Sequence, residues 1–132
     1  MSHKTNEMDA HTLKIISDKN LNSCMNNTKW NELVSAITSD PNHNPNVIIK
    51  YIQEDKITSS FTPVWWEDVK RDGFEIIEWV KIDPISKEYV GRLVEPSETD
   101  YSDFIEQGLK SCNIPFELDN GIYTIYGYKP GN

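Results

Sequence analysis

Residues 74–83 alternate in character, and this stretch constrains the fold more than any other part of the sequence. The even-numbered positions are apolar with one exception, and they are Phe74, Ile76, Glu78, Val80 and Ile82. Ile77 and Trp79 add a second apolar patch at odd-numbered positions. Because successive residues of a strand point to opposite faces, the pattern predicts a central strand that is buried on one face and partly covered on the other, with Trp79 in the core.

The neighbouring segments predict further strands. Asp83-Pro84 interrupts the ladder, because proline has no N–H to donate to a partner strand. Residues 89–94 then read as the returning strand of a central hairpin. Upstream, residues 47–52 are β-branched and apolar with one lysine, which is typical of a strand. Residues 70–73 read as a turn.

Two amphipathic helices are predicted, one on each side of this hairpin. The first follows the capping residues 26–28, and its apolar positions recur at i, i+3, i+4 and i+7: Trp30, Leu33, Val34 and Ile37. The second would be capped by Thr99 or Asp100 and would end at Asn113. Its apolar positions are Tyr101, Phe104, Ile105, Leu109 and Cys112.

Asp119-Asn120-Gly121 predicts a second hairpin, between residues 114–118 and 122–128. The Asn-Gly pair tolerates the positive φ angles of a type I′ turn. Antiparallel strands interleaved with helices indicate an α+β fold, a mainly antiparallel sheet of about five strands with two main helices packed on one face. We expect residues 25–132 to form this single domain and residues 1–24 to be a polar tail or a loosely docked segment, with a short helix around Leu13 as one form of it.

Composition places the chain among cytoplasmic proteins. At 132 residues it is long enough for one domain with a core, and its fourteen aromatic residues argue against disorder. The N-terminus lacks the pattern of a secretory signal, and no apolar run approaches the ~20 residues that span a membrane. Cys24 and Cys112 fit reduced thiols better than a disulfide framework.

The sequence offers little for catalysis or for cofactors. His3, His11 and His43 all lie in the polar N-terminal third, and neither cysteine has a ligand neighbour at metal-site spacing, so no metal is expected. The glycine-rich motifs of nucleotide sites are missing, and no cofactor is expected. Cys112 falls on an apolar stripe, where thiols are usually buried and inert.

Acidic residues are concentrated in residues 95–119, which carry seven carboxylates against Lys110 alone, in a chain of net charge -8. One interpretation is a solvated acidic face that serves solubility. The other is a docking surface for a basic protein, for which the candidate residues are Glu95, Glu98, Asp100, Asp103 and Glu106. Direct binding of nucleic acid is disfavoured, because phosphate contacts need a basic patch.

Trp65-Trp66 is a second candidate for partner binding. If the pair lies on a strand, one ring fills the core and the other faces out, and an exposed tryptophan is a frequent hot spot in interfaces. The alternative is that both rings pack in the core. Glu67 follows the pair, and a carboxyl group beside an aromatic wall can have a raised pKa. These three residues are therefore the place to expect a pocket if the protein binds a small ligand.

The sequence resembles a family of small, uncharacterised bacterial proteins known as domain of unknown function 6678. The segments that carry the resemblance are NNTKWNELVSAI, IIEWVKIDPI, GRLVEP and NIPFELDNGIYTIYGY, at residues 26–37, 76–85, 91–96 and 113–128. Residues 1–24 fall outside this pattern. The resemblance implies a single cytosolic domain and no particular activity. In size, acidity and aromatic content the chain is also similar to immunity proteins of toxin systems.

The function expected from the sequence is therefore that of a non-enzymatic, cytosolic interaction protein, for example an acidic immunity or inhibitor protein that binds a basic toxin. The alternative is a small enzyme or ligand-binding domain with a pocket near Trp65, Trp66 and Glu67. A homodimer formed by pairing of sheet edges is a third possibility.

Overall fold

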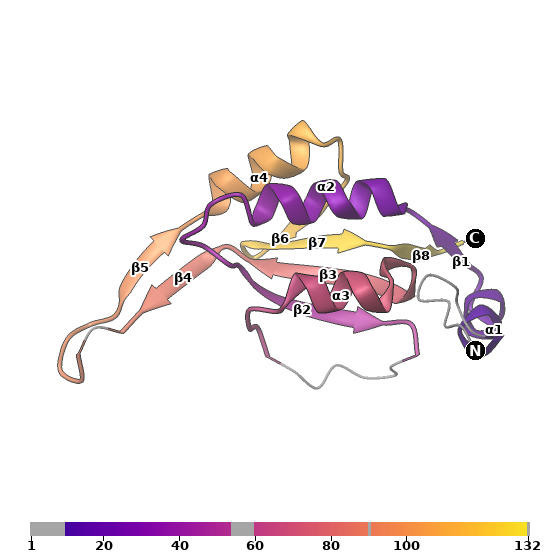
Figure 1. The fold of residues 1–132 in the computed structure, drawn as a ribbon, viewed down its shortest axis with the longest axis horizontal. Coiled ribbons are helices and arrows are strands. Elements are labelled where there is room, and N and C mark those ends of the chain that lie inside the picture. The colour runs from indigo at the N-terminus through magenta and orange to yellow at the C-terminus, as the bar shows by residue number, and fades with distance from the viewer. Residues whose placement is uncertain (1–9, 54–59, 90, 132) are drawn as a thin grey trace.

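The computed structural model describes residues 10–53, 60–89 and 91–131. An antiparallel sheet carries helices on one face, and a narrow arm projects from one end (Figure 1). The helices are α1 Ala10–Asp18, α2 Asn27–Ile37, α3 Trp66–Asp72 and α4 Ser102–Ser111, with a turn of 3-10 helix, η1, at Phe74–Ile76. The strands are β1 Leu21–Ser23, β2 Asn46–Tyr51, β3 Ile77–Asp83, β4 Ile85–Glu88, β5 Ser97–Asp100, β6 Glu117–Asp119, β7 Ile122–Tyr126 and β8 Tyr128–Pro130. The predicted α+β class is confirmed.

The strands form one main sheet and two short ribbons. The main sheet has four antiparallel strands in the order β2-β3-β7-β6. β4 pairs only with β5, and β1 only with β8. Pro84 separates β3 from β4 and a bend at Gly127 separates β7 from β8, so the strands do not merge into the single five-stranded sheet that was predicted.

The core lies between the main sheet and the helices α2, α3 and α4. On the sheet, the register aligns two rows of side chains toward the helices, Val47, Ile82 and Tyr123 in one row and Ile49, Val80 and Ile125 in the next. The helices bury Trp30, Leu33 and Ile37 from α2, Trp66 and Val69 from α3, and Ile105 and Leu109 from α4. A Cβ at Gly108 would lie 3.1 Å from the Ala36 Cβ. Glycine in the middle of α4 is thus explained by the close approach of α2.

The predicted cap of α2, the predicted end of α4 and the second hairpin are confirmed, whereas Thr99 and Asp100 lie in β5 and the N-cap of α4 is Tyr101. Asn26 caps α2, and its side chain accepts a hydrogen bond from the Lys29 backbone N–H at 2.8 Å. Asn113 follows α4 with φ 56°, a left-handed conformation that stops the helix. Asn120 and Gly121, with φ 52° and 80°, turn β6 into β7. Positive φ at both turn positions is what a type I′ hairpin turn requires.

The prediction of a central hairpin ending in residues 89–94 is wrong. Pro84 interrupts the ladder but does not reverse the chain, which runs on from β3 into β4. The reversal comes later, within residues 89–96, of which Val90 lies outside the described residues. The returning strand is β5, whose register joins Ile85 to Asp100 and Glu88 to Ser97. Residues that were assigned to a buried strand thus form the tip of the arm.

Trp79 lies outside the core, and a β-bulge explains why the prediction failed. Lys50 pairs with Trp79 and Tyr51 with Ile77, so Glu78 has no partner of its own on β2. An extra residue shifts the alternation of a strand. Ile77 is therefore buried among the helices, while Trp79 is half-buried on the other face of the sheet. Upstream, residues 70–73 were read as a turn, but residues 70–72 belong to α3 and Gly73 follows its end.

α1 and β1, which precede α2, pack at the end of the molecule where the C-terminal strand β8 lies. β1 pairs with β8, and the Gly131 N–H donates a hydrogen bond to the Asn20 carbonyl at 2.7 Å. Leu21, Ile52 and Tyr128 form a second small cluster of buried side chains, against which α1 packs Ile15 and Ile16. This end lies opposite the arm (Figure 1).

Candidate functional site

The arm formed by β4 and β5 is exposed along most of its length, with every residue of β5 exposed. It extends away from the main sheet as an isolated ribbon (Figure 1). Its base is fixed, because the Tyr101 N–H donates to the Pro84 carbonyl at 2.9 Å. The imidazole of His43 stacks on the Tyr101 ring with a centroid distance of 3.6 Å and an angle of 9° between the planes. Burial lowers the pKa of His43, an effect that Asp40 partly opposes.

The tip of the arm exposes large apolar side chains. Tyr89 is 75% exposed, Leu93 is fully exposed and Val94 is 57% exposed. A shallow hollow lies among Tyr89, Val94 and the neighbouring Arg92. Isolated two-stranded ribbons are marginally stable in water, and grouped apolar side chains at the surface frequently mark interaction sites. The tip therefore has the properties of a contact that is completed by another molecule.

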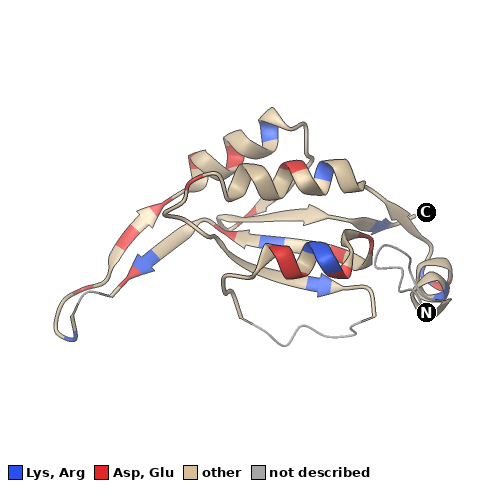
Figure 2. Cartoon of the chain, viewed as in Figure 1, with Lys and Arg blue, Asp and Glu red and all other residues tan. Residues whose placement is uncertain are grey.

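The structure places the predicted acidic residues along the arm and on the first turns of α4. Glu95 lies at the tip, Glu98 and Asp100 on β5, and Asp103 and Glu106 on α4. Figure 2 shows red segments running from the arm onto the helix, with blue also on the arm, where Lys87 and Arg92 lie. Lys87 lies 3.9 Å from Glu98 across the ribbon, so part of the acidic charge is offset.

Two more of these carboxylates, Glu106 and Asp100, have partners within the fold. Glu106 accepts hydrogen bonds from Lys110 at 2.7 Å and from the Tyr123 hydroxyl at 3.0 Å, and these bonds lower its pKa. Burial, together with this carboxylate, raises the pKa of Tyr123 to about 12. Asp100 accepts from the backbone and hydroxyl of Ser102, which lowers its pKa and fixes the entry to α4. Glu95 and Asp103 are exposed and are the better candidates for meeting a partner.

The two neighbouring tryptophans occupy different environments. Trp65 precedes the first residue of α3 and is 80% exposed, whereas Trp66 begins the helix and is 8% exposed within the core. One indole ring is therefore buried in the core and the other is exposed to solvent, as predicted. The cause is their position at the start of a helix and not the alternation of side chains along a strand. The alternative that both rings pack in the core is wrong. Trp65 and Trp66 thus lie at the start of α3, and Trp66 shares the core with Ile105 and Leu109 of α4.

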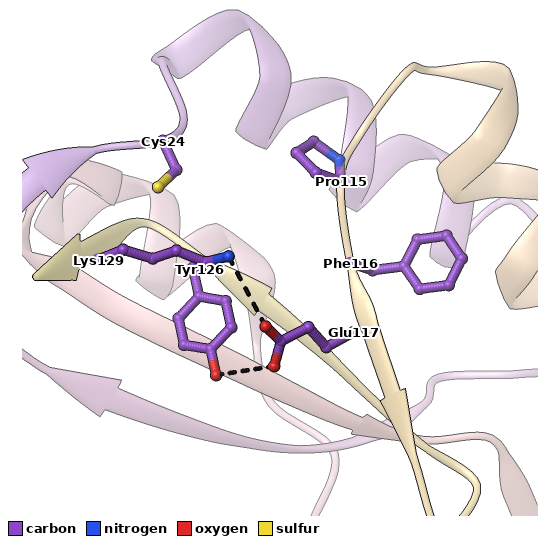
Figure 3. Close-up of a pocket in the computed structure, with 6 residues that line it drawn as sticks. All are labelled: Cys24, Pro115, Phe116, Glu117, Tyr126 and Lys129. Carbon is purple, nitrogen blue, oxygen red and sulfur yellow. Dashed lines mark hydrogen bonds and ion pairs between the residues drawn. The ribbon is translucent and has the colours of Figure 1, made fainter.

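A small, partly open pocket lies beside β7, at the edge of the sheet (Figure 3). Its volume is about 80 Å³, and it is lined by Cys24, Pro115, Phe116, Glu117, Tyr126 and Lys129. The Glu117 carboxylate accepts a hydrogen bond from the Tyr126 hydroxyl at 3.2 Å and lies 3.7 Å from the Lys129 ammonium. Burial raises the pKa of Tyr126, and Glu117 adds to the effect. The space suffices for a few water molecules but not for a drug-sized ligand.

Sequence reasoning missed the residues of the arm tip and the surface around Trp79. A signal for the tip was present, since Gly91 and Pro96 bracket its exposed Leu93 and Val94 and both favour turns. The bulge that turns Trp79 outward leaves no comparable mark in the sequence.

The fold and its surfaces define a small α+β domain with an exposed β-arm. The sequence model of the family of unknown function DUF6678 matches residues 12–132, and the chain belongs to that family. The match begins upstream of the segments on which the resemblance rested, so it includes part of α1 and all of β1. No curated protein and no solved structure matches the chain. In the part of the chain that the structure describes, no helix has the length and apolar character needed to cross a membrane.

Proposed function

We propose that this protein is a non-enzymatic interaction domain that acts in the cytosol and docks a basic protein through its β4–β5 arm. An acidic inhibitor or immunity protein that neutralises a basic toxin would use such a surface. The observation that carries the proposal is the apolar tip of Tyr89, Leu93 and Val94 on a projecting ribbon with carboxylates along its flank.

The two parts of this surface would have different roles. Apolar side chains at the centre of an interface supply most of the affinity, because the partner removes them from water. Carboxylates such as Glu95 and Glu98, at the rim, would attract a basic partner and raise the association rate more than the affinity. This division predicts that tip and rim variants fail in distinguishable ways.

The test of the tip is capture of the partner from lysate of the native host by three immobilised proteins. They are the wild type, Leu93→Ser, and the matched control Leu13→Ser, which removes a 50% exposed leucine from α1. We expect wild type and Leu13→Ser to retain the same protein and Leu93→Ser to lose it. Equal retention by all three would contradict docking through the tip.

The test of the rim uses the purified partner in stopped-flow association experiments. Glu95→Lys should slow association severalfold at low salt, and the difference from wild type should shrink as salt is raised toward 1 M. Glu67→Lys, an equivalent reversal on α3, should leave the rate near that of wild type. Glu106 is unsuitable for this purpose, because its carboxylate already accepts hydrogen bonds from Lys110 and from the Tyr123 hydroxyl within the fold.

Self-association is the remaining outcome. A wild-type dimer that becomes a monomer on Leu93→Ser would identify the partner as a second copy of this chain. That result would replace the basic-partner proposal. Sedimentation equilibrium of both proteins decides it before any capture experiment.

A further inference from the structure

The face of the main sheet opposite the helices carries a second surface, which the proposed function does not use. The register brings side chains of three strands together on it: Ile48 and Lys50 from β2, Trp79 and Lys81 from β3, and Thr124 and Tyr126 from β7. Rows run across the strands, with Ile48, Lys81 and Thr124 in one and Lys50, Trp79 and Tyr126 in the next. All six are separated by the backbone of the sheet from the core described above.

A hollow of about 300 Å³ lies on this face. Phe61 and Trp79 supply aromatic surface, Ile48 and Ile122 supply aliphatic surface, and Lys81 and Asp119 are the charged residues at its rim. Small-molecule sites are typically concave, mainly apolar and at least about 300 Å³, with few polar groups that fix the ligand's orientation. The hollow meets this description at its lower limit of size.

The cations on this face are not equivalent. Lys50 is paired with Glu78 at 2.6 Å, and Lys129 with Glu117 at 3.7 Å. The Lys81 ammonium lies 5.0 Å from the centroid of the Trp79 ring and forms no ion pair with any residue that the structure describes. The lysine that borders the hollow is therefore the one whose charge is left for another group.

No carboxylate among the described residues lies within 4.0 Å of the Lys81 ammonium, and Glu117, which stands in the same row of the sheet, is paired with Lys129. Asp83 accepts a hydrogen bond from the Ile85 N–H at 3.0 Å, at the start of the arm. Asp119 stands two strands across and two residues along the sheet from Lys81, a separation on the order of 10 Å between their Cα atoms. Asp119 lies at the end of the hollow away from Lys81, and its carboxylate repels an anion there. The anionic group of a ligand is therefore favoured at the Lys81 end.

We propose that this hollow binds a small aromatic anion, an arene carboxylate or sulfonate, and that Lys81 holds its anionic group. The ring of the ligand packs against Phe61, Ile48 and Trp79, since aromatic surfaces pair favourably and remove one another from water. The anionic group meets the Lys81 ammonium above Trp79, where a charge-assisted hydrogen bond is stronger than one between neutral groups. A neutral apolar ligand would leave that ammonium unused, and a long polyanion would meet Asp119.

The test compares two fluorescent probes that share one ring system. One is 8-anilinonaphthalene-1-sulfonate, which is an anion, and the other is N-phenyl-1-naphthylamine, which is neutral. Each is titrated into wild type, Lys81→Met, Trp79→Ala and the control Lys87→Met, which removes an exposed lysine from the arm. Circular dichroism and thermal midpoints first establish that each variant is folded.

We expect Lys81→Met to weaken binding of the sulfonate at least about fivefold and to leave binding of the neutral probe within about twofold. Trp79→Ala should weaken both probes, and Lys87→Met neither. Amide resonances that shift on adding the sulfonate should belong to β2, β3 and β7 and not to residues 91–96.

The inference fails if the sulfonate does not bind at about 1 mM, or if Lys81→Met binds both probes as wild type does. It fails equally if Leu93→Ser abolishes binding, because the probe would then be reporting the apolar tip of the arm. None of these outcomes bears on partner docking, which the arm variants test separately.

Discussion

Replacement of Gly127 by alanine tests the sheet geometry directly, because space and not backbone torsion requires glycine there. Gly127 lies between β7 and β8, and its N–H donates to the Glu78 carbonyl at 2.8 Å. An added Cβ would lie 2.3 Å from the Ile77 carbonyl oxygen and 3.2 Å from the Trp30 ring. Ordinary contacts of a Cβ begin at about 3.4 Å, so the overlap with backbone is about 1 Å. No side-chain rotation relieves it, and β7 must move away from β3.

The cost should therefore reach the upper end of the range for overpacking, about 3 kcal/mol of unfolding free energy. With an unfolding entropy of about 2.1 cal/mol/K per residue over 132 residues, that loss lowers the thermal midpoint by about 11 °C. Thermal unfolding followed by circular dichroism measures the shift, and urea titration measures the free energy independently.

Gly121→Ala is the matched control, since it makes the same substitution six residues earlier, at a glycine that is required by its backbone torsion and not by space. Gly121 has φ 80°, and apart from its own chain neighbours no atom of the described residues would lie within 4 Å of an added Cβ. Only backbone strain opposes alanine there, at about 1 kcal/mol, or about 4 °C. A Gly127→Ala protein within ~0.5 kcal/mol of wild type, or more stable than Gly121→Ala, would refute the reasoning.

Two further predictions follow from buried side chains. Trp66 is buried and Trp65 is exposed, so Trp66→Ala should lower the free energy of unfolding by about 3–5 kcal/mol and Trp65→Ala by less than ~0.5 kcal/mol. Urea titration measures both values. Equal losses would contradict the difference in exposure between the two side chains. Burial lowers the pKa of His43 in the folded protein from its ordinary value of 6.5. As the pH falls through 6.5, the unfolded chain therefore binds a proton before the folded protein does. The free energy of unfolding decreases until the pH is below the pKa of His43 in the folded protein. His43→Phe keeps the aromatic stack on Tyr101 and should lose less stability than wild type between pH 7.5 and 5.5; identical losses in the two proteins would contradict the effect.

Patterns that act over a few residues predicted much of this fold. The stripe in α2, its cap at Asn26 and the Asn-Gly turn each depend on local chemistry, and the structure contains all three. The class of the fold follows from these elements, because antiparallel strands and helices with one apolar face can bury that face in few ways.

The failures share a different origin, in pairing between distant strands. Whether Trp79 points to the core depends on the bulge opposite Lys50 and Tyr51, and nothing within residues 74–83 records it. Likewise Pro84 marks a break in a ladder, but whether the chain then turns or continues depends on which strand it next meets, here β5.

The candidate sites were predictable to the extent that they rest on composition. The acidic residues were identified as a group, since charge is visible in the sequence, and the structure adds that Glu106 is already engaged with Lys110 and Tyr123. The tip residues Leu93 and Val94 were missed because apolar side chains are assigned to a core by default. Only the position of the chain reversal shows them to be exposed.

The pairing of β1 with β8 has a consequence for the order of folding. It joins residues 21–23 to residues 128–130, more than a hundred positions apart, and contacts that close such long loops tend to form late. During synthesis, β1 leaves the ribosome long before β8 is made. α1 and β1 therefore cannot form their native contacts until α2 and all the later strands have been synthesised. Leu21 and Ile52 therefore lack their contact with Tyr128 until the last residues have been synthesised. We expect a chaperone to have its largest effect on the nascent chain during that interval.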